Sequence, residues 1–288
     1  MKQYILRNVK PDADGYQKLI DFYLEFKDLF WEDFELSFES WFSANLCAPL
    51  GAILDKIKVD KLSDVLLINM PQSIQHIFQR NEFLSYYGFP KILDDRQTVI
   101  KYLKLKPEDS KFFTQYIKEE LIGHRGIPDL SERLKRKITE SIYEMFVNAK
   151  MHSQTKFIYT CGQFFPQNKS IWFTITDVGV GFKAKINERF GSDLSSAQSI
   201  KWAVQNGKTT KTDVTGGIGL ALLKEFITKN KGKMQIISGN GFYSFDSSQE
   251  TTQDLDGDFP GTIISMEFKT DDTSSYSLIS EVDINNIF

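Results

Sequence analysis

The sequence predicts an α+β protein in which a small α/β unit precedes a larger unit of helices packed on a sheet. The chain has 288 residues, 41% of them hydrophobic, which is enough for one large or two medium domains with substantial cores. Residues 1–105 alternate between strand-like and helix-like segments. Residues 106–270 begin with helices and continue mostly with strands, an order that favours a two-layer α/β sandwich.

Apolar periodicity predicts six elements within residues 1–105. Short runs of aliphatic and aromatic residues alternate with runs in which apolar residues recur every three or four positions. We expect strands over 4–9, 34–38 and 65–69, and helices over 15–28, 43–54 and 73–87. Residues 90–109 show less periodicity, so we place the boundary between the two units near residue 105.

In residues 106–270 the helices come first. We expect helices over 109–122, 131–151 and 220–228, and strands over 156–159, 171–176, 233–238 and 262–268. The helix over 131–151 carries one apolar stripe, which includes Ile138, Ile142 and Met145. Residues 271–288 are rich in Ser and Asp and are expected to form a C-terminal tail.

Charge and cysteine content narrow the class of protein. The formal net charge is -3, so the composition gives no support for the basic surface that non-specific nucleic-acid binding requires. Two cysteines, Cys47 and Cys161, are too few for a disulfide framework and fit a reducing cytosol. No apolar run approaches the roughly 20 residues that span a bilayer, and the N-terminus lacks a signal-peptide core. We expect a cytoplasmic protein that binds neither nucleic acid nor membrane.

A polar pair follows the apolar stripe of the helix predicted over 131–151. Glu144 and Asn148 are four residues apart, so they share one helix face beside that stripe. At the edge between helix and sheet, a carboxylate can deprotonate a nucleophile and a carboxamide oxygen can ligate Mg²⁺. The alternative interpretation is an ordinary polar pair on a half-exposed helix face.

A short segment with two glycines follows the strand predicted over 171–176. Asp177 at the end of that strand can accept hydrogen bonds from an exocyclic amine. Gly179 and Gly181 allow positive φ angles and a close approach of the backbone to a ligand. A simple strand-to-loop turn is the alternative.

A second glycine-rich segment leads into the helix predicted over 220–228. Gly216, Gly217 and Gly219 expose backbone N–H groups where the helix dipole adds positive potential. Such a helix start suits a phosphate group. The alternative is a flexible hinge.

Taken in order, these motifs resemble those of the GHKL superfamily, whose ATP-binding domain has the Bergerat fold. Residues 144–153 resemble its N box, 177–181 its first glycine box and 215–220 its second. Gly261 and Thr262, at the head of the last predicted strand, resemble the Gly-Thr pair beside the adenine pocket. The match spans about residues 109–270 and implies binding of ATP and Mg²⁺.

The resemblance implies a role for each of these residues. Asn148 would coordinate the Mg²⁺ that bridges the phosphates, and Glu144 would be the general base. Asp177 would accept the adenine amino group, supported by Thr262. Residues 182–215 would form a lid over the nucleotide, although the lysines near its end, Lys208 and Lys211, are equally explained as solvated charges. The other expected nucleotide contacts are Gly179, Gly181, Lys208, Thr209, Gly216, Gly217, Gly219 and Leu220.

Within the superfamily the chain is most similar to the anti-sigma-factor serine kinases, which are small and carry Glu in the N box. Residues 1–105 loosely resemble a STAS domain, the usual substrate and partner of those kinases. In that alignment the phosphoacceptor position falls on Cys47, which argues against a substrate within the same chain. An unrelated α/β docking domain is the alternative.

Two classes of function follow from the resemblance. One is an enzyme that hydrolyses ATP or transfers its γ-phosphate to a protein Ser or Thr, that is, an ATPase or an anti-sigma-type kinase. The other is an interaction module in which ATP binding changes partner affinity with little turnover. Both imply a regulatory protein partner, and a homodimer is compatible with either.

Aromatic residues make up 14% of the chain and crowd its first 42 residues. That density is high for a strand–helix–strand unit, so we expect some of these side chains to remain exposed. An exposed aromatic surface would serve a protein partner or dock on the ATPase domain. Trp31 and Trp41 are the candidates that we single out.

Overall fold

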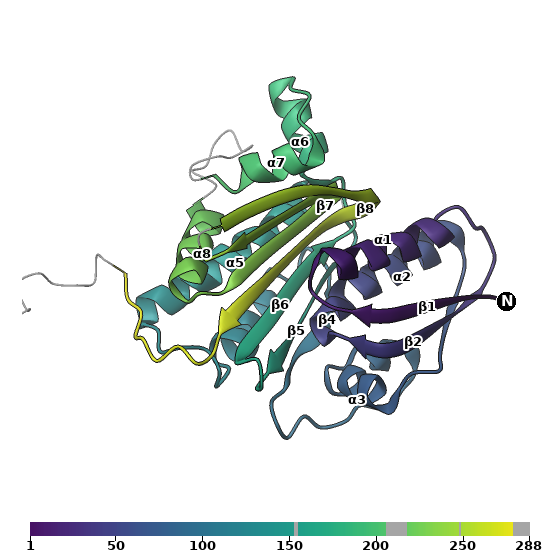
Figure 1. Ribbon diagram of the computed structural model, residues 1–288, viewed down its shortest axis with the longest axis horizontal. Helices are drawn as coiled ribbons and strands as arrows, with labels where there is room; N and C mark the ends of the chain where they lie inside the picture. The colour runs from purple at the N-terminus through teal and green to yellow at the C-terminus, as the bar shows by residue number, and fades with distance from the viewer. Residues whose placement is uncertain (153–154, 206–217, 248, 279–288) are drawn as a thin grey trace, which may run out of the picture.

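The computed structural model describes residues 1–152, 155–205, 218–247 and 249–278, and its strands form two sheets (Figure 1). One sheet has three parallel strands in the order β1-β2-β3. The other has five antiparallel strands in the order β4-β5-β6-β8-β7. The predicted α+β class is confirmed.

The N-terminal unit contains the strands and helices expected within residues 1–90. They are β1 (Lys2–Val9), α1 (Ala13–Phe26), β2 (Phe34–Phe42), η1 (Ala44–Leu46), α2 (Cys47–Lys61), β3 (Val65–Ile68), α3 (Gln72–Arg80) and η2 (Phe83–Tyr87). The Asp12 side chain caps α1 by accepting a hydrogen bond from Gly15 N at 2.8 Å. The single helix expected over 73–87 is divided in two, because Glu82 adopts a left-handed conformation with φ of 67°.

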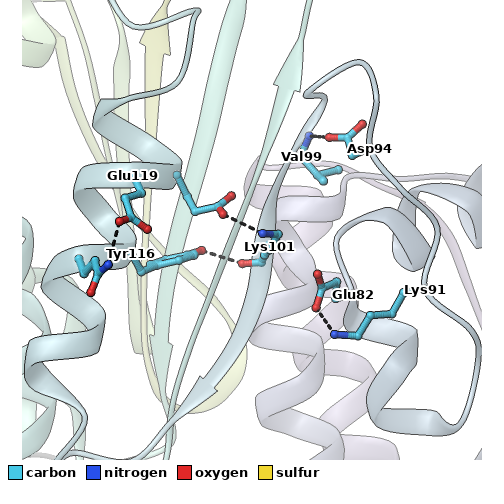
Figure 2. Close-up of polar contacts among 9 residues, drawn as sticks. Glu82, Lys91, Asp94, Val99, Lys101, Tyr116 and Glu119 are labelled. Carbon is cyan, nitrogen blue, oxygen red and sulfur yellow. Dashed lines mark hydrogen bonds and ion pairs between the residues drawn. The ribbon is translucent and has the colours of Figure 1, made fainter.

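Strand β4 (Val99–Leu105) was not expected, because Lys101 and Lys104 interrupt the apolar pattern of a segment without clear periodicity. Figure 2 shows how Lys101 is held: its Nζ pairs with Glu120 Oε1 at 3.0 Å, and its carbonyl accepts from the Tyr116 hydroxyl at 2.7 Å. Upstream, Val99 N donates to Asp94 Oδ2 at 2.9 Å. β4 therefore precedes the boundary predicted at residue 105 but pairs with β5 of the larger sheet.

The second part of the chain supplies the remaining elements. They are α4 (Ser110–Tyr116), η3 (Ile117–Ile122), α5 (Glu132–His152), β5 (Ile158–Phe165), β6 (Ser170–Asp177), α6 (Gly181–Phe190), α7 (Ser196–Ala203), α8 (Ile218–Lys229), β7 (Lys233–Asp246) and β8 (Gln249–Lys269). All the helices and strands expected over 109–270 are present. Helices α6 and α7, and the long extension of the β7–β8 hairpin beyond the predicted strand ends, were not predicted.

Different parts of the chain cover the two faces of the five-stranded sheet. Ile158, Ile175 and Ile264 pack in one apolar cluster with residues of α5 and α8. On the opposite face, Tyr159 and Ile263 share a cluster with the core of the N-terminal unit. Figure 1 shows α1 and α2 between the two sheets, with α5 and α8 on the far side of the larger one. None of the helices in the described part of the chain is long and apolar enough to cross a membrane.

Most of the aromatic residues near the N-terminus are in the core. Phe22, Phe26 and Phe34 are buried, and the rings of Phe26 and Phe34 stack with centroids 3.9 Å apart. Three aromatic side chains in the same region are exposed, namely Phe30, Trp31 and Trp41. The aromatic surface expected there is therefore limited to two small places, and its role as a partner surface stays a prediction.

Candidate functional site

A row of polar side chains crosses three strands at one end of the larger sheet. Asp177, the last residue of β6, lies opposite Thr262 of β8, and Thr262 lies opposite Ser238 of β7. Side chains alternate between the faces of a sheet, and the residues two positions away, such as Ile175 and Ile264, pack under α5 and α8. The row therefore points to the helix-covered face.

Hydrogen bonds fix this row. Asp177 Oδ1 accepts from Gly179 N at 2.9 Å, which closes a tight turn directly after β6. Ser238 Oγ accepts from Phe182 N at 2.9 Å and lies 3.3 Å from Thr262 Oγ1. Asp177 and Thr262 are each only 8% exposed. The end of an apolar face thus carries a nearly buried carboxylate beside two hydroxyl groups.

Two glycines allow the backbone to close around the row. Gly261 has φ of 157°, and a Cβ atom placed on it would lie 2.0 Å from the Asp177 carbonyl oxygen. Gly181 has φ of 72°, and a Cβ atom there would lie 2.7 Å from Ser238 Oγ. Only glycine accommodates both the backbone angle and the close approach. β8 and the loop after Asp177 therefore touch through their main chains.

A cavity of about 610 Å³ adjoins this loop, a volume typical of small-molecule sites. Its walls come from the loop after β6, from α6 and α7, and from β7 and β8. The lining residues are Gly179, Val180, Gly181, Lys183, Ala184, Asn187, Ser196, Ser238, Gly239, Asn240, Asp258, Phe259, Pro260 and Gly261. Of these, Gly179 and Gly181 were predicted as site residues.

Several polar residues that line this cavity were not predicted from the sequence. Lys183 and Asn187 lie on α6, within the segment expected to be a lid, and Asp258 lies in the unpredicted extension of β8. Ser238 ends the strand expected over 233–238, as Asp177 follows the strand expected over 171–176. The position of Ser238 at the end of a predicted strand, like that of Asp177, is the feature of the sequence that could have indicated it as a site residue.

Helix α5 places the polar pair on the same side of the sheet as the Asp177 row. Met145 and Ala149 pack in the apolar cluster that includes Ile175. Glu144 is half-buried and Asn148, one turn later, is exposed, as expected for positions beside the apolar stripe. The helix face that carries Glu144 and Asn148 therefore borders the covered face of the sheet.

Helix α8 packs against α5 and carries two more of the predicted nucleotide contacts. Gly219 lies in its first described turn, and Leu220 follows it with a half-buried side chain. The other four predicted contacts, Lys208, Thr209, Gly216 and Gly217, lie outside the described residues. Of the segment 182–215 expected as a lid, the described part forms most of α6 and all of α7.

Cys47, the position where the STAS resemblance would place a phosphoacceptor, is inaccessible. It starts α2, it is fully buried, and burial raises the pKa of its thiol well above the ordinary value. Cys161 is buried on the facing strand β5, with its Sγ 3.2 Å from the carbonyl oxygen of Ala44. A buried, neutral thiol is a poor phosphate acceptor.

No protein-family model matches the chain, and no curated protein matches it. The geometry joins a buried carboxylate, two hydroxyls and close-packed glycine backbone at the covered end of an antiparallel sheet.

Proposed function

We propose that this chain binds Mg-ATP between α5, α8 and the Asp177 end of the five-stranded sheet, in a domain with the Bergerat fold. The observation that carries the proposal is the pairing of Asp177 with Thr262 in one nearly buried row. A carboxylate accepts hydrogen bonds, and a hydroxyl both donates and accepts. Adenine offers a matching set, because its exocyclic amine donates and its ring nitrogens accept.

The residues around the row support the same ligand. Gly181 and Gly261 leave no side chain where the backbone of β8 meets the loop after Asp177. The GHKL resemblance covers the segments that hold Glu144, Asn148, Asp177 and Thr262. These four residues lie on α5, β6 and β8, which pack in the same core. That arrangement is the one expected if α5 borders the phosphates and the sheet row holds the base.

Asn148 fits the role of a magnesium ligand. Its carboxamide is exposed beside the covered face of the sheet. Among the described residues, no group of three or more His, Cys, Asp or Glu side chains could hold a metal. Mg²⁺ commonly keeps several waters and is held by few protein oxygens together with substrate phosphates, so a single carboxamide suffices. The ion would supply charge neutralisation at the phosphates.

Glu144 is the residue to which we assign proton removal. It is half-buried on α5, one turn before Asn148. In hydrolysis or phosphotransfer, an oxygen of water or of a protein Ser or Thr bonds to the γ-phosphorus while the bond to the β–γ bridging oxygen breaks and ADP leaves. Glu144 takes the proton of the attacking oxygen, which is the ordinary task of a general base.

The test combines Mg-ATP binding with product analysis from γ-labelled ATP. Wild-type chain should bind Mg-ATP and release labelled phosphate or label a protein acceptor. Glu144→Gln should keep the affinity and lose turnover by about 100-fold or more. Glu140→Gln is the matched control, because Glu140 lies one turn earlier on α5 and pairs with Lys137 at 2.8 Å. Absence of Mg-ATP binding by the wild-type chain would overturn the proposal.

The second candidate is a nucleotide-gated interaction module, and an exposed corner of the N-terminal unit favours it. Trp31 is 76% exposed and has φ of 57°, an uncommon conformation for a bulky residue. The backbone N–H of Trp31 donates to the carbonyl of Lys61 at 2.9 Å, which brings Trp31 beside the exposed Leu62. An exposed apolar group on constrained backbone is a feature of binding surfaces.

The two candidates differ in what Glu144→Gln does to partner binding. If the chain is a gated module, ATP should still change the amount of partner that copurifies with Glu144→Gln, because binding alone sets the state. If it is an enzyme, regulation should be lost together with turnover. In both cases Trp31→Ser should reduce partner capture without changing Mg-ATP affinity, and unchanged capture would remove this corner from the interface.

A further inference from the structure

Strand β8 departs from the sheet register shortly before it reaches the Asp177 row. Phe259 lies opposite Gly239, whereas Asp254 lies opposite Gly241, so residues 255–258 bulge out of the ladder. Leu255, the first residue of the bulge, and Phe259, directly after it, are buried in the core of the N-terminal unit. The bulge is therefore seated on that unit.

Helix α1 holds this bulge through the side-chain amide of Gln17, which both donates and accepts a hydrogen bond. Gln17 Nε2 donates to the carbonyl of Asp256 at 2.8 Å, and Asp256 N donates to Gln17 Oε1 at 2.8 Å. At the next position Gly257 has φ of 91°, and a Cβ atom there would lie 2.4 Å from Leu24 Cδ1. Two hydrogen bonds and a close contact thus fix the bulge on one face of α1.

The chain that leaves this clamp forms a wall of the candidate site. Asp258, Phe259, Pro260 and Gly261 line the 610 Å³ cavity. Gly261 then touches the carbonyl of Asp177 through its main chain, and Thr262 follows it in the polar row. Residues 257–261 are thus the short segment that connects Asp256 to the loop after β6.

We propose that Gln17 is a positioning residue through which the N-terminal unit sets the affinity of the Asp177 site for nucleotide. Its side chain fixes Asp256, Asp256 fixes the cavity wall, and the wall fixes the loop of Asp177. An event on the N-terminal unit that moves α1 changes the shape of the site. The inference depends on the proposed function for the identity of the ligand, but the mechanical link does not.

The first test compares Gln17→Ala with Gln3→Ala in the full chain. Gln3 is the control because its side chain also makes an exposed hydrogen bond, to Glu35 at 2.6 Å, but within the N-terminal unit. Gln17→Ala should weaken Mg-ATP binding about fivefold, and Gln3→Ala should leave it unchanged. Equal affinities of the two variants would overturn the inference.

Hydrogen exchange tests the link without relying on ATP. In the absence of nucleotide, Gln17→Ala should exchange faster than Gln3→Ala at residues 178–181 as well as at 254–261. Faster exchange at 254–261 alone would overturn the inference, because the bulge would then move independently of the loop. If the wild-type chain does not bind Mg-ATP, the proposed function fails, and this exchange comparison still decides on the link.

The wild-type chain provides a third measurement that needs no variant to fold. Mg-ATP should slow exchange at 178–181, at 254–261 and within α1. Protection confined to 178–181 would support the nucleotide site and contradict the proposed role of Gln17.

Discussion

Two polar rows cross β6, β8 and β7 of the larger sheet but point to opposite faces. The row beneath the N-terminal unit consists of Cys161, Thr174, Ser265 and Gln235, which lie opposite one another on β5, β6, β8 and β7. The row beneath α5 and α8 consists of Asp177, Thr262 and Ser238. Both rows are nearly buried, so burial alone does not distinguish them.

The partners of the two rows do distinguish them. Asn45 Nδ2 donates to Thr174 Oγ1 at 3.1 Å, Thr174 and Ser265 hydroxyls are 2.8 Å apart, and Tyr16 donates to Gln235 at 3.0 Å. These partners come from the N-terminal unit or from the row itself. The Asp177 row is instead held by the glycine loop that lines a cavity. Identical strands thus provide a docking surface on one face and a candidate ligand site on the other.

The largest effect that separates the rows is expected at Asp177. Asp177→Asn replaces an accepting oxygen by an amide that donates, so it opposes the adenine amine. Mg-ATP affinity should fall about 100-fold, since hydrogen bonds to charged groups contribute roughly 1.5–3 kcal/mol. Titration calorimetry measures the effect. An affinity equal to that of the wild-type chain would remove Asp177 from the site.

A substitution in the row beneath the N-terminal unit should instead lower stability and leave nucleotide affinity unchanged. Thr174→Val leaves the buried groups of Asn45 and Ser265 without their partner, which costs roughly 1–3 kcal/mol of the free energy of unfolding. Urea unfolding should show this loss, whereas Mg-ATP affinity should not change. A large loss of affinity in Thr174→Val would mean that the two faces are not separate.

A smaller loss is expected at the end of the same row. Tyr16 is fully buried, burial raises the pKa of its hydroxyl well above the ordinary value, and the hydroxyl therefore remains a donor to Gln235. Tyr16→Phe should reduce the free energy of unfolding by about 1 kcal/mol. Stability equal to that of the wild-type chain would show that this contact does not hold the N-terminal unit in place.

The smallest effect concerns pH and His124, at the other end of the helix-covered face. Its Nδ1 accepts from Gly126 N at 3.1 Å, its Nε2 lies 2.9 Å from Gln97 O, and its ring packs on Phe164. Burial is the main cause that lowers the pKa of this imidazole below its ordinary value of 6.5, and Arg125 adds to it, while Gln97, Asp94 and Glu120 oppose it.

The sign of the pH effect follows from that lowered pKa. Below pH 6.5 the unfolded chain binds a proton that the folded chain does not, so this contribution to stability is complete above pH 6.5 and is lost as the pH falls. The midpoint temperature of thermal unfolding should therefore fall more between pH 7 and pH 5 for the wild-type chain than for His124→Gln. Parallel pH profiles would contradict the assignment.

Local patterns predicted most of the fold. Two features could be predicted because neighbouring residues in the sequence define them: the apolar stripe of α5 and the position of Asp177 at the end of a strand. Strand β4 could not be predicted in this way, because its lysines pair with carboxylates that are distant in sequence: Lys101 with Glu120 and Lys104 with Asp55. The row beneath the N-terminal unit could not be predicted either, since Asn45 and Thr174 are 129 positions apart and neither belongs to a motif.

The candidate site was predicted in part for the same reason. Glu144, Asn148, Asp177 and Thr262 lie in motifs whose order is visible in the chain, and the structure brings their elements to one face. Ser238, Lys183 and Asp258 lie at the site because of how β7, α6 and the β8 bulge are placed in the fold. The bulge requires Gly257, and the reason is visible only in the structure, where a Cβ atom on this residue would collide with Leu24 of α1.

The shared apolar cluster also bears on the order in which the chain is made. Phe22 and Leu50 of α1 and α2 pack in one cluster with Tyr159, Ile237 and Ile263 of the larger sheet. A ribosome delivers the two helices first and β8 near the end, so their apolar surfaces stay uncovered during most of translation. Release of a nascent chain before β8 emerges would leave the N-terminal unit without its cover, and the finished protein should unfold in one transition.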